Sequence, residues 1–427
     1  MTHIKNKFGF LFTVVAAVMF ICSVDSTAQD WSRWRGSNGD GIYREANLNL
    51  DWAQSKPSVS WTFRQAGAGY STPVIVGNTL YCQGAADGSD FAFALDTQTG
   101  NLKWKQSLGP EFVMDRGHGP RGAVTVDGDR LYLIRGGGQI HCLSATDGRM
   151  IWQKDFRRDL GGNIMSRTDW GFSESPLVDG NLVICTPGGN QGTLVALDKN
   201  TGNVVWRSRE WTDLGGYSSP IVAEIHGVRQ YIQFTAGGVA GVSAADGKLL
   251  WKANIASNQT AVCSTPVYHD NIVYVSSGYN AGCGAVRIHR EGNEFRAETL
   301  YTNRNISNHH GGVVQVNGNI YGFSDTPPAW VCQNMTTGEI VWSERQSGIG
   351  KGSIKGVNDR FILLDERNGT IAVIAASPNG WREFGRMEIP ERSTHRSVDN
   401  AVWTHPVVAN GKLYIRDHEL LFCFDLK

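Results

Sequence analysis

The 427-residue chain has no excess charge of either sign, because 40 Lys and Arg residues balance 40 Asp and Glu residues. This balance gives no electrostatic reason to expect a nucleic acid or an anionic membrane as a partner. Windows with strong helical amphipathicity are few, and no short spacing of His or Cys suggests a metal-binding motif. In contrast, the 51 Gly and 14 Trp residues predict an all-β protein with many turns.

A long apolar run is also missing, since the most apolar stretch, 8–22, is too short for a confident membrane span. Lys5 and Lys7 precede this run, and the small residues Ser26-Thr27-Ala28 follow it. This order is typical of a secretory signal peptide at 1–28 with cleavage after Ala28, so we expect a periplasmic or extracellular protein. Lipid anchoring through Cys22 is disfavoured because the residues before it are bulky.

The cysteines do not form an obvious disulfide framework, because seven of the eight follow residue 28 and seven is an odd number. Five of them recur at two equivalent repeat positions, and we interpret these as small buried hydrophobic residues: Cys82, Cys142, Cys185, Cys332 and Cys423. Only Cys263 and Cys283 lie close enough within one repeat for a disulfide hypothesis.

A recurring hairpin organises the rest of the chain. Residues 91–109 alternate like a strand, turn at Asp96 to Gly100, and continue into a second strand that carries Trp104. Related hairpins occur at 194–206, 331–342, 142–152 and 242–251. A unit that recurs every few tens of residues indicates a repeat architecture.

The opening strands of these units predict an eight-bladed β-propeller of four-stranded blades, as a single domain at 58–427. The predicted blades are 70–109, 119–156, 171–209, 216–255, 262–302, 310–346, 350–389, and 399–427 completed by 58–65. The last blade therefore combines N- and C-terminal strands, which would pair edges that are otherwise open. Residues 29–57 are expected to be an irregular surface segment.

The repeats resemble the pyrroloquinoline-quinone (PQQ)-like propeller repeat, with the pattern Ala-x-Asp-x-x-Thr-Gly-x-x-x-Trp. Ala94, Asp96, Thr99, Gly100 and Trp104 match this pattern, and a second copy begins at Ala196. The resemblance implies that Trp residues dock neighbouring blades, here Trp61, Trp104, Trp152, Trp206, Trp251 and Trp342. It implies either a quinoprotein dehydrogenase or a non-enzymatic scaffold similar to the outer-membrane assembly lipoprotein.

Loops that enter the blades carry Arg, His, Asp and Trp residues, and they should form one mouth of the central channel. Glu174 and His405 stand out because the equivalent channel positions in other blades are small. The candidate ligand-binding residues are Arg116, His118, Arg121, Arg167, Asp169, Trp170, Glu174, His309, His310, His395, Arg396, Asp399, Trp403 and His405.

The leading hypothesis is an exported monomer that serves as a binding or protein-interaction module, with its ligand at the channel mouth. A PQQ- and calcium-dependent alcohol or sugar dehydrogenase is the alternative, with calcium ligands among Glu174, Asp169, Asp399 and Asn400. The adjacent cysteine pair of such alcohol dehydrogenases is absent. A glycan-binding or glycan-active protein and a metal site built from the channel histidines also stay open, as does whether the protein is an enzyme.

Overall fold

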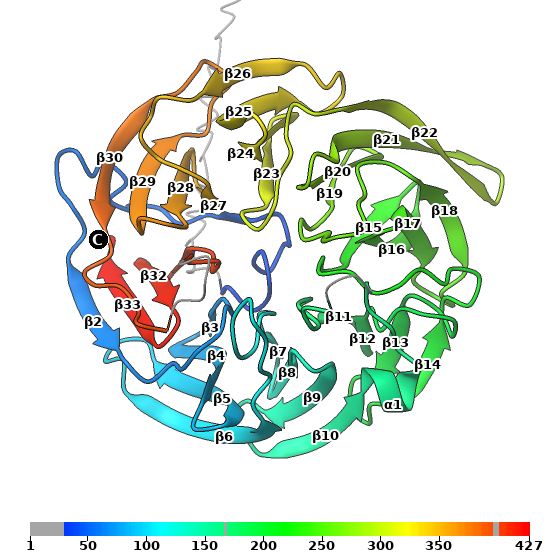
Figure 1. The fold of residues 1–427 in the computed structure, drawn as a ribbon, viewed down its shortest axis with the longest axis horizontal. Coiled ribbons are helices and arrows are strands. Elements are labelled where there is room, and N and C mark those ends of the chain that lie inside the picture. Colours follow the sequence, from blue (N-terminus) through cyan, green and yellow to red (C-terminus); the bar gives the residue numbers. More distant parts are fainter. Residues whose placement is uncertain (1–29, 166–168, 396–400) are drawn as a thin grey trace, which may run out of the picture.

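The computed structural model describes residues 30–165, 169–395 and 401–427, and these form a ring of eight antiparallel sheets (Figure 1). Seven sheets have four strands, and the eighth has four strands plus one short addition. The predicted eight-bladed β-propeller is therefore confirmed. Within the described residues the only helix is α1 (Phe156–Leu160), and none is long and apolar enough to cross a membrane.

The first four blades follow one another along the chain, each with its strands in sequence order from the channel outward. Their strands are β3 (Val74–Val76), β4 (Thr79–Ala86), β5 (Ser89–Asp96) and β6 (Leu102–Pro110); β7 (Thr125–Asp127), β8 (Arg130–Ile134), β9 (Gln139–Ser144) and β10 (Met150–Asp155); β11 (Leu177–Asp179), β12 (Leu182–Cys185), β13 (Val195–Asp198) and β14 (Val204–Arg207); β15 (Ile221–Ile225), β16 (Val228–Thr235), β17 (Gly238–Ser243) and β18 (Leu249–Ala253).

The remaining blades continue the ring. Their strands are β19 (Val267–His269), β20 (Ile272–Ser277), β21 (Gly282–Glu291) and β22 (Glu294–Asn303); β23 (Val313–Val316), β24 (Asn319–Asp325), β25 (Pro328–Asn334) and β26 (Ile340–Glu344); β27 (Gly352–Val357), β28 (Arg360–Asp365), β29 (Thr370–Ala375) and β30 (Glu383–Glu388); β31 (Val407–Ala409), β32 (Lys412–Asp417) and β33 (Leu420–Asp425), with β2 (Val59–Phe63) as the outer strand.

The ring closes as the sequence predicts. Strand β2 pairs antiparallel with β33, with Val59 opposite Phe424 and Phe63 opposite Leu421. The two ends of the chain thus share one blade, and the pairing occupies the edge that β33 would otherwise leave open.

The segment before β2 differs from the prediction, because it is not confined to the surface. It crosses the middle of the ring as the dark blue trace in Figure 1, and its short strand β1 (Ile42–Tyr43) pairs in parallel with β27. Trp31 forms a bridge with Ile75 and is buried, as are Tyr43 and Trp52. The aromatic side chains explain the difference, since burying each one removes a large apolar area from water.

The repeated turn is held by its own side chains. The Oδ1 atom of Asp96 accepts hydrogen bonds from the backbone N–H groups of Gln98 and Thr99 and from the Thr99 hydroxyl. Gly100 completes the turn with a φ angle of 72°, a left-handed conformation that favours glycine. Asp198, Thr201 and Gly202 repeat this arrangement.

Four of the recurrent Trp side chains contact the next blade through their indole N–H groups. The N–H of Trp61 donates to the carbonyl oxygen of Thr97, that of Trp104 to Ala145, that of Trp152 to Lys199 and that of Trp342 to Ser377. Trp251 instead donates to Gln230 of its own blade. The fifth blade lacks this Trp, and Tyr301 contacts the next turn through Met335.

All seven cysteines of the described chain are free. The disulfide hypothesis for Cys263 and Cys283 is therefore wrong. Cys283 is buried inside β21, whereas Cys263 lies before β19 on the channel side. The five cysteines predicted to be small buried residues are all buried.

Candidate functional site

A cavity of about 630 Å³ occupies one mouth of the channel, within the range of sites for small organic ligands. Its walls combine aromatic rings, imidazoles and cationic side chains. They are formed by Trp34, Tyr70, Thr72, Arg116, Arg121, Trp170, Ser173, Tyr217, Thr260, Ala261, Cys263, Tyr279, His309, His310, Lys351, Glu366, Arg367, Trp403 and His405. Seven of the candidate residues are among them: Arg116, Arg121, Trp170, His309, His310, Trp403 and His405.

One repeat position supplies much of this wall. It is the residue three positions before the proline of each opening strand, and in this position Tyr70, Ser173, Tyr217, Cys263 and Trp403 all line the cavity. In the three blades without that proline, the equivalent residues Arg121, His310 and Lys351 also line it. This signal is absent from the sequence predictions because they compare only the next two positions of the repeat.

The residue that follows this wall position points away from the cavity. This corrects the expectation that Glu174 reaches into the channel. Side chains alternate in direction along an extended chain, so the residues after the wall position are buried in the blade. Ser71, Glu174, Ser218 and Ser264 are all buried there. Glu174 accepts a hydrogen bond from the backbone N–H of Thr186 at 2.7 Å, and burial raises the pKa of its carboxyl to about 7.

The other predicted residues lie outside the cavity wall. His118 is half exposed near Glu111, and Asp169 forms an exposed ion pair with Arg157. His395 is exposed as well. Arg167, Arg396 and Asp399 lie outside the described residues.

A row of stacked rings runs along one side of the cavity. The ring of Tyr279 meets that of His309 edge-on at 4.9 Å, and the ring centroids of His309 and His310 are 3.8 Å apart. His310 stacks on Trp403 at 4.3 Å, and Trp403 lies 4.9 Å from Tyr70. These contacts present flat aromatic surfaces to a ligand.

The histidines of this cavity are uncharged at neutral pH. Burial lowers the pKa of His309 to about 3 and that of His405 to about 4, and it holds the pKa of His310 well below its usual value. The positive charge of Lys351 lowers the pKa values of His309 and His310 further.

The permanent charges on the wall are mainly positive. Arg121 donates to the carbonyl oxygens of Gly119 and Gly117, and burial lowers the pKa of its guanidinium to about 10. Lys351 lies 3.1 Å from a carboxylate oxygen of Asp325 and 3.9 Å from one of Glu366. Burial raises the pKa of Glu366 to about 7, which weakens the only carboxylate among the described lining residues.

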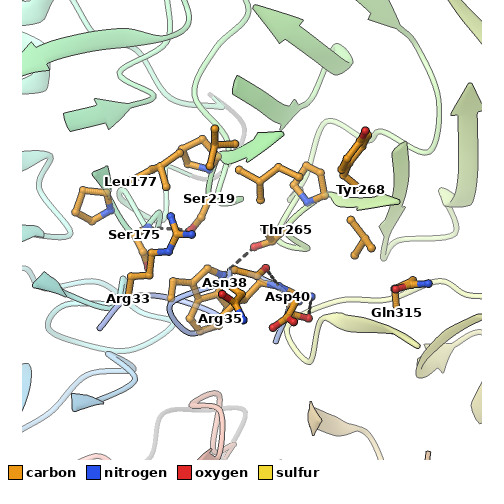
Figure 2. Close-up of a pocket in the computed structure, with 18 residues that line it drawn as sticks. Arg33, Arg35, Asn38, Asp40, Ser175, Leu177, Ser219, Thr265, Tyr268 and Gln315 are labelled. Carbon is orange, nitrogen blue, oxygen red and sulfur yellow. Dashed lines mark hydrogen bonds between the residues drawn. The ribbon is translucent and has the colours of Figure 1, made fainter. Parts of the chain in front are cut away.

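Trp34 lies between this cavity and a narrower one of about 160 Å³, since it lines both. The narrower cavity lies between the N-terminal segment and the opening strands of four blades, represented by Ser175, Ser219, Thr265 and Gln315 (Figure 2). Arg35 nearby is buried and donates to the carbonyl oxygen of Val313. The N-terminal segment thus gives the channel a floor.

The described wall does not fit a calcium ion of the kind that accompanies PQQ. Calcium takes six to eight oxygen ligands, commonly from carboxylates. Of the calcium ligands expected from the sequence, Glu174 and Asp169 both lie away from the cavity, and Asp399 and Asn400 lie outside the described residues. The described lining residues therefore lack the oxygen ligands that calcium-dependent quinone chemistry would need.

Comparison with known proteins relates this chain to one family. The family model described as "Outer membrane protein assembly factor BamB" matches residues 92–344. The protein of that name from Yersinia pestis is 26% identical over 348 residues, which cover 78% of this chain and 79% of the relative. Tetrathionate hydrolase from Acidithiobacillus ferrooxidans is 24% identical over 242 residues, which cover 53% of this chain but only 44% of that enzyme.

Solved structures share the propeller. BamB from Moraxella catarrhalis superimposes with a TM-score of 0.62 at 16% identity, covering 87% of this chain and 98% of that one. Quinohemoprotein alcohol dehydrogenase from Comamonas testosteroni gives a TM-score of 0.64 at 11% identity, covering 93% and 80%. At such identities the likeness establishes the fold alone.

Proposed function

Because this chain belongs to the family described as outer membrane protein assembly factor BamB, we propose that it is an exported binding module whose ligand occupies the channel cavity. The observation that carries the proposal is the cavity of about 630 Å³ with its aromatic and cationic wall. The signal peptide expected at 1–28 supports export and lies outside the described residues.

The wall favours a ligand with a flat group and a negative charge. Arg116, Arg121, Lys351 and Arg367 contribute cationic groups, whereas Glu366 is the one carboxylate among the described lining residues. Arg121 bonds to carbonyl oxygens and so keeps its full positive charge for a ligand. The rings of Trp403 and His310 provide stacking surfaces for the flat group.

The test is a titration of the purified full-length protein with a panel of aromatic carboxylates, including PQQ with and without calcium. Isothermal titration calorimetry would measure affinity, and the melting temperature would report stabilisation by the ligand. We expect saturable binding of at least one flat anionic compound, weakened at least tenfold by Trp403→Ala or Arg121→Gln.

The matched control is Lys103→Gln, which changes an exposed cation on the outer strand β6. This variant should bind as tightly as the unchanged protein. Failure of every flat anion to bind, or equal binding by Trp403→Ala and the unchanged protein, would reject the cavity as the binding site.

A further inference from the structure

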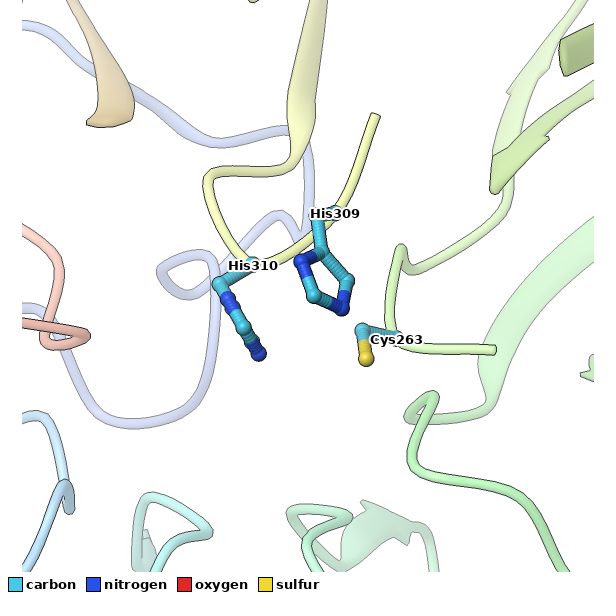
Figure 3. A group of neighbouring side chains, drawn as sticks. All are labelled: Cys263, His309 and His310. Carbon is cyan, nitrogen blue, oxygen red and sulfur yellow. The ribbon is translucent and has the colours of Figure 1, made fainter. Parts of the chain in front are cut away.

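Three potential metal ligands meet on the wall of the channel cavity (Figure 3). Cys263 comes from the segment before β19, and His309 and His310 come from the segment before β23 in the next blade. The Cys263 sulfur and one nitrogen of each imidazole lie within 4.8 Å of one another. Figure 3 shows the His309 ring between Cys263 and His310.

We propose that Cys263, His309 and His310 bind a zinc-class transition-metal ion, with the fourth coordination position open to the cavity. Imidazole and thiolate ligands suit ions of this class, and three protein ligands with one open position are typical of zinc sites that accept an exchangeable ligand. The proposal does not depend on the binding function proposed above, since the ion needs only these three side chains.

The unsatisfied nitrogens of the two imidazoles support this site independently of their spacing. The Nε2 atom of His309 and the Nδ1 atom of His310 are buried and have no hydrogen-bond partner. Buried polar atoms are normally paired, so two such atoms on adjacent rings require an explanation. A bound cation would provide one, because uncharged imidazole is the form that ligates a metal.

Asp325 is placed to orient His309 when a metal is bound. Lys351 Nζ lies 2.9 Å from His309 Nδ1 and donates to it, which puts the ring proton on Nε2. Ligation through Nε2 moves that proton to Nδ1, which then needs an acceptor. Asp325 Oδ2 is 3.8 Å from Nδ1, and Asp325 Oδ1 is buried without a partner. Carboxylates commonly orient metal-bound histidines in this way.

Binding requires a small contraction of the cluster. Metal–ligand bonds of about 2.0–2.3 Å place tetrahedral ligand atoms about 3.5 Å apart. In the structure the three ligand atoms are separated by up to 4.8 Å. Rotation of the Cys263 side chain can contribute to this change, because Cys263 lies on the cavity wall. Cys263 would release its thiol proton to solvent as the sulfur binds the ion.

The test uses Co²⁺ as a spectroscopic probe for zinc in the purified full-length protein. We expect one equivalent to bind with a thiolate-to-cobalt charge-transfer band and the visible absorption of a tetrahedral ion, and Zn²⁺ should displace it. Cys263→Ser should remove the charge-transfer band. Cys283→Ser is the matched control, a free cysteine of the same blade, and should retain it.

Two further variants test the surrounding groups. Asp325→Asn should weaken Co²⁺ binding by about 10- to 100-fold, as expected for loss of an orienting carboxylate. Lys351→Met should tighten binding, because it removes both a nearby positive charge and the donor to His309 Nδ1. No charge-transfer band in the unchanged protein, or a band that survives Cys263→Ser and His309→Gln, would overturn the proposal.

Discussion

The indole N–H of Trp34 donates a hydrogen bond to the hydroxyl of Thr265 at 2.9 Å, across 231 positions of sequence. This contact fixes the N-terminal segment against the opening strand of the fifth blade. It also places the Trp34 ring 4.7 Å from that of His405, at the floor of the main cavity. The segment before the first blade is therefore part of the cavity wall.

Two substitutions of Trp34 should destabilise the protein to different extents. Trp34→Phe loses the hydrogen bond to Thr265 and should lower the free energy of unfolding by about 1 kcal/mol. Trp34→Ala also loses the packed ring and should cost about 3 kcal/mol in total. Urea denaturation measures both values, with Arg44→Ala as a control in the exposed part of the same segment. Equal stability of the Phe and Ala variants would show that the ring contributes nothing.

Substitution of Trp206 would test the expectation that the recurrent Trp residues dock neighbouring blades. Its ring is buried, stacks on Tyr231 of the next blade at 6.0 Å, and covers the turn glycine Gly247. Trp206→Ala should lower the free energy of unfolding by about 3–5 kcal/mol. The neighbouring Val205 is exposed, so Val205→Ala should change it by less than about 0.5 kcal/mol. A near-neutral Trp206→Ala would reject the docking role.

Closure of the ring can be tested by removing the pairing of β2 with β33. Replacing residues 58–65 with a Gly-Ser sequence of equal length keeps the chain connected but removes the side chains that pack this strand. We expect a clear fall in the melting temperature and a more open, protease-sensitive ring. The same replacement at the exposed residues 54–56 is the control. An unchanged melting temperature would contradict the importance of closure.

The buried carboxyl of Glu174 predicts a pH dependence of stability. Its pKa rises from 4.5 to about 7 on folding because of burial. Between these values the folded protein holds a proton that the unfolded chain has lost, so the free energy of unfolding falls as the pH rises. The full shift corresponds to about 3 kcal/mol.

Urea denaturation of Glu174→Gln and the unchanged protein between about pH 4.5 and about pH 8 would measure this contribution. The stability advantage of the unchanged protein should decrease by about 3 kcal/mol across that interval. Glu294→Gln, at an exposed position of β22, should show no such trend. A constant difference between Glu174→Gln and the unchanged protein would disprove the assignment.

Much of the cavity wall can be predicted from the sequence, and the missing residues share one repeat position. Arg121 and Trp403 are predicted from their residue type, and both line the cavity. Tyr70, Tyr217 and Cys263 occupy the same repeat position as these two but are not among the predicted residues. Comparing that position between blades would have identified them, because equivalent residues of a propeller face the same channel.

The blades, their number and the closure of the ring can all be predicted from the sequence. These features depend on local patterns, namely alternating strands and turns such as Asp96 to Gly100, and on strand pairing between neighbours. The folded structure is needed to show that the N-terminal segment crosses the channel and that Cys263 approaches His309. Such contacts join different blades, and their geometry follows from how the closed ring packs its side chains rather than from any local pattern.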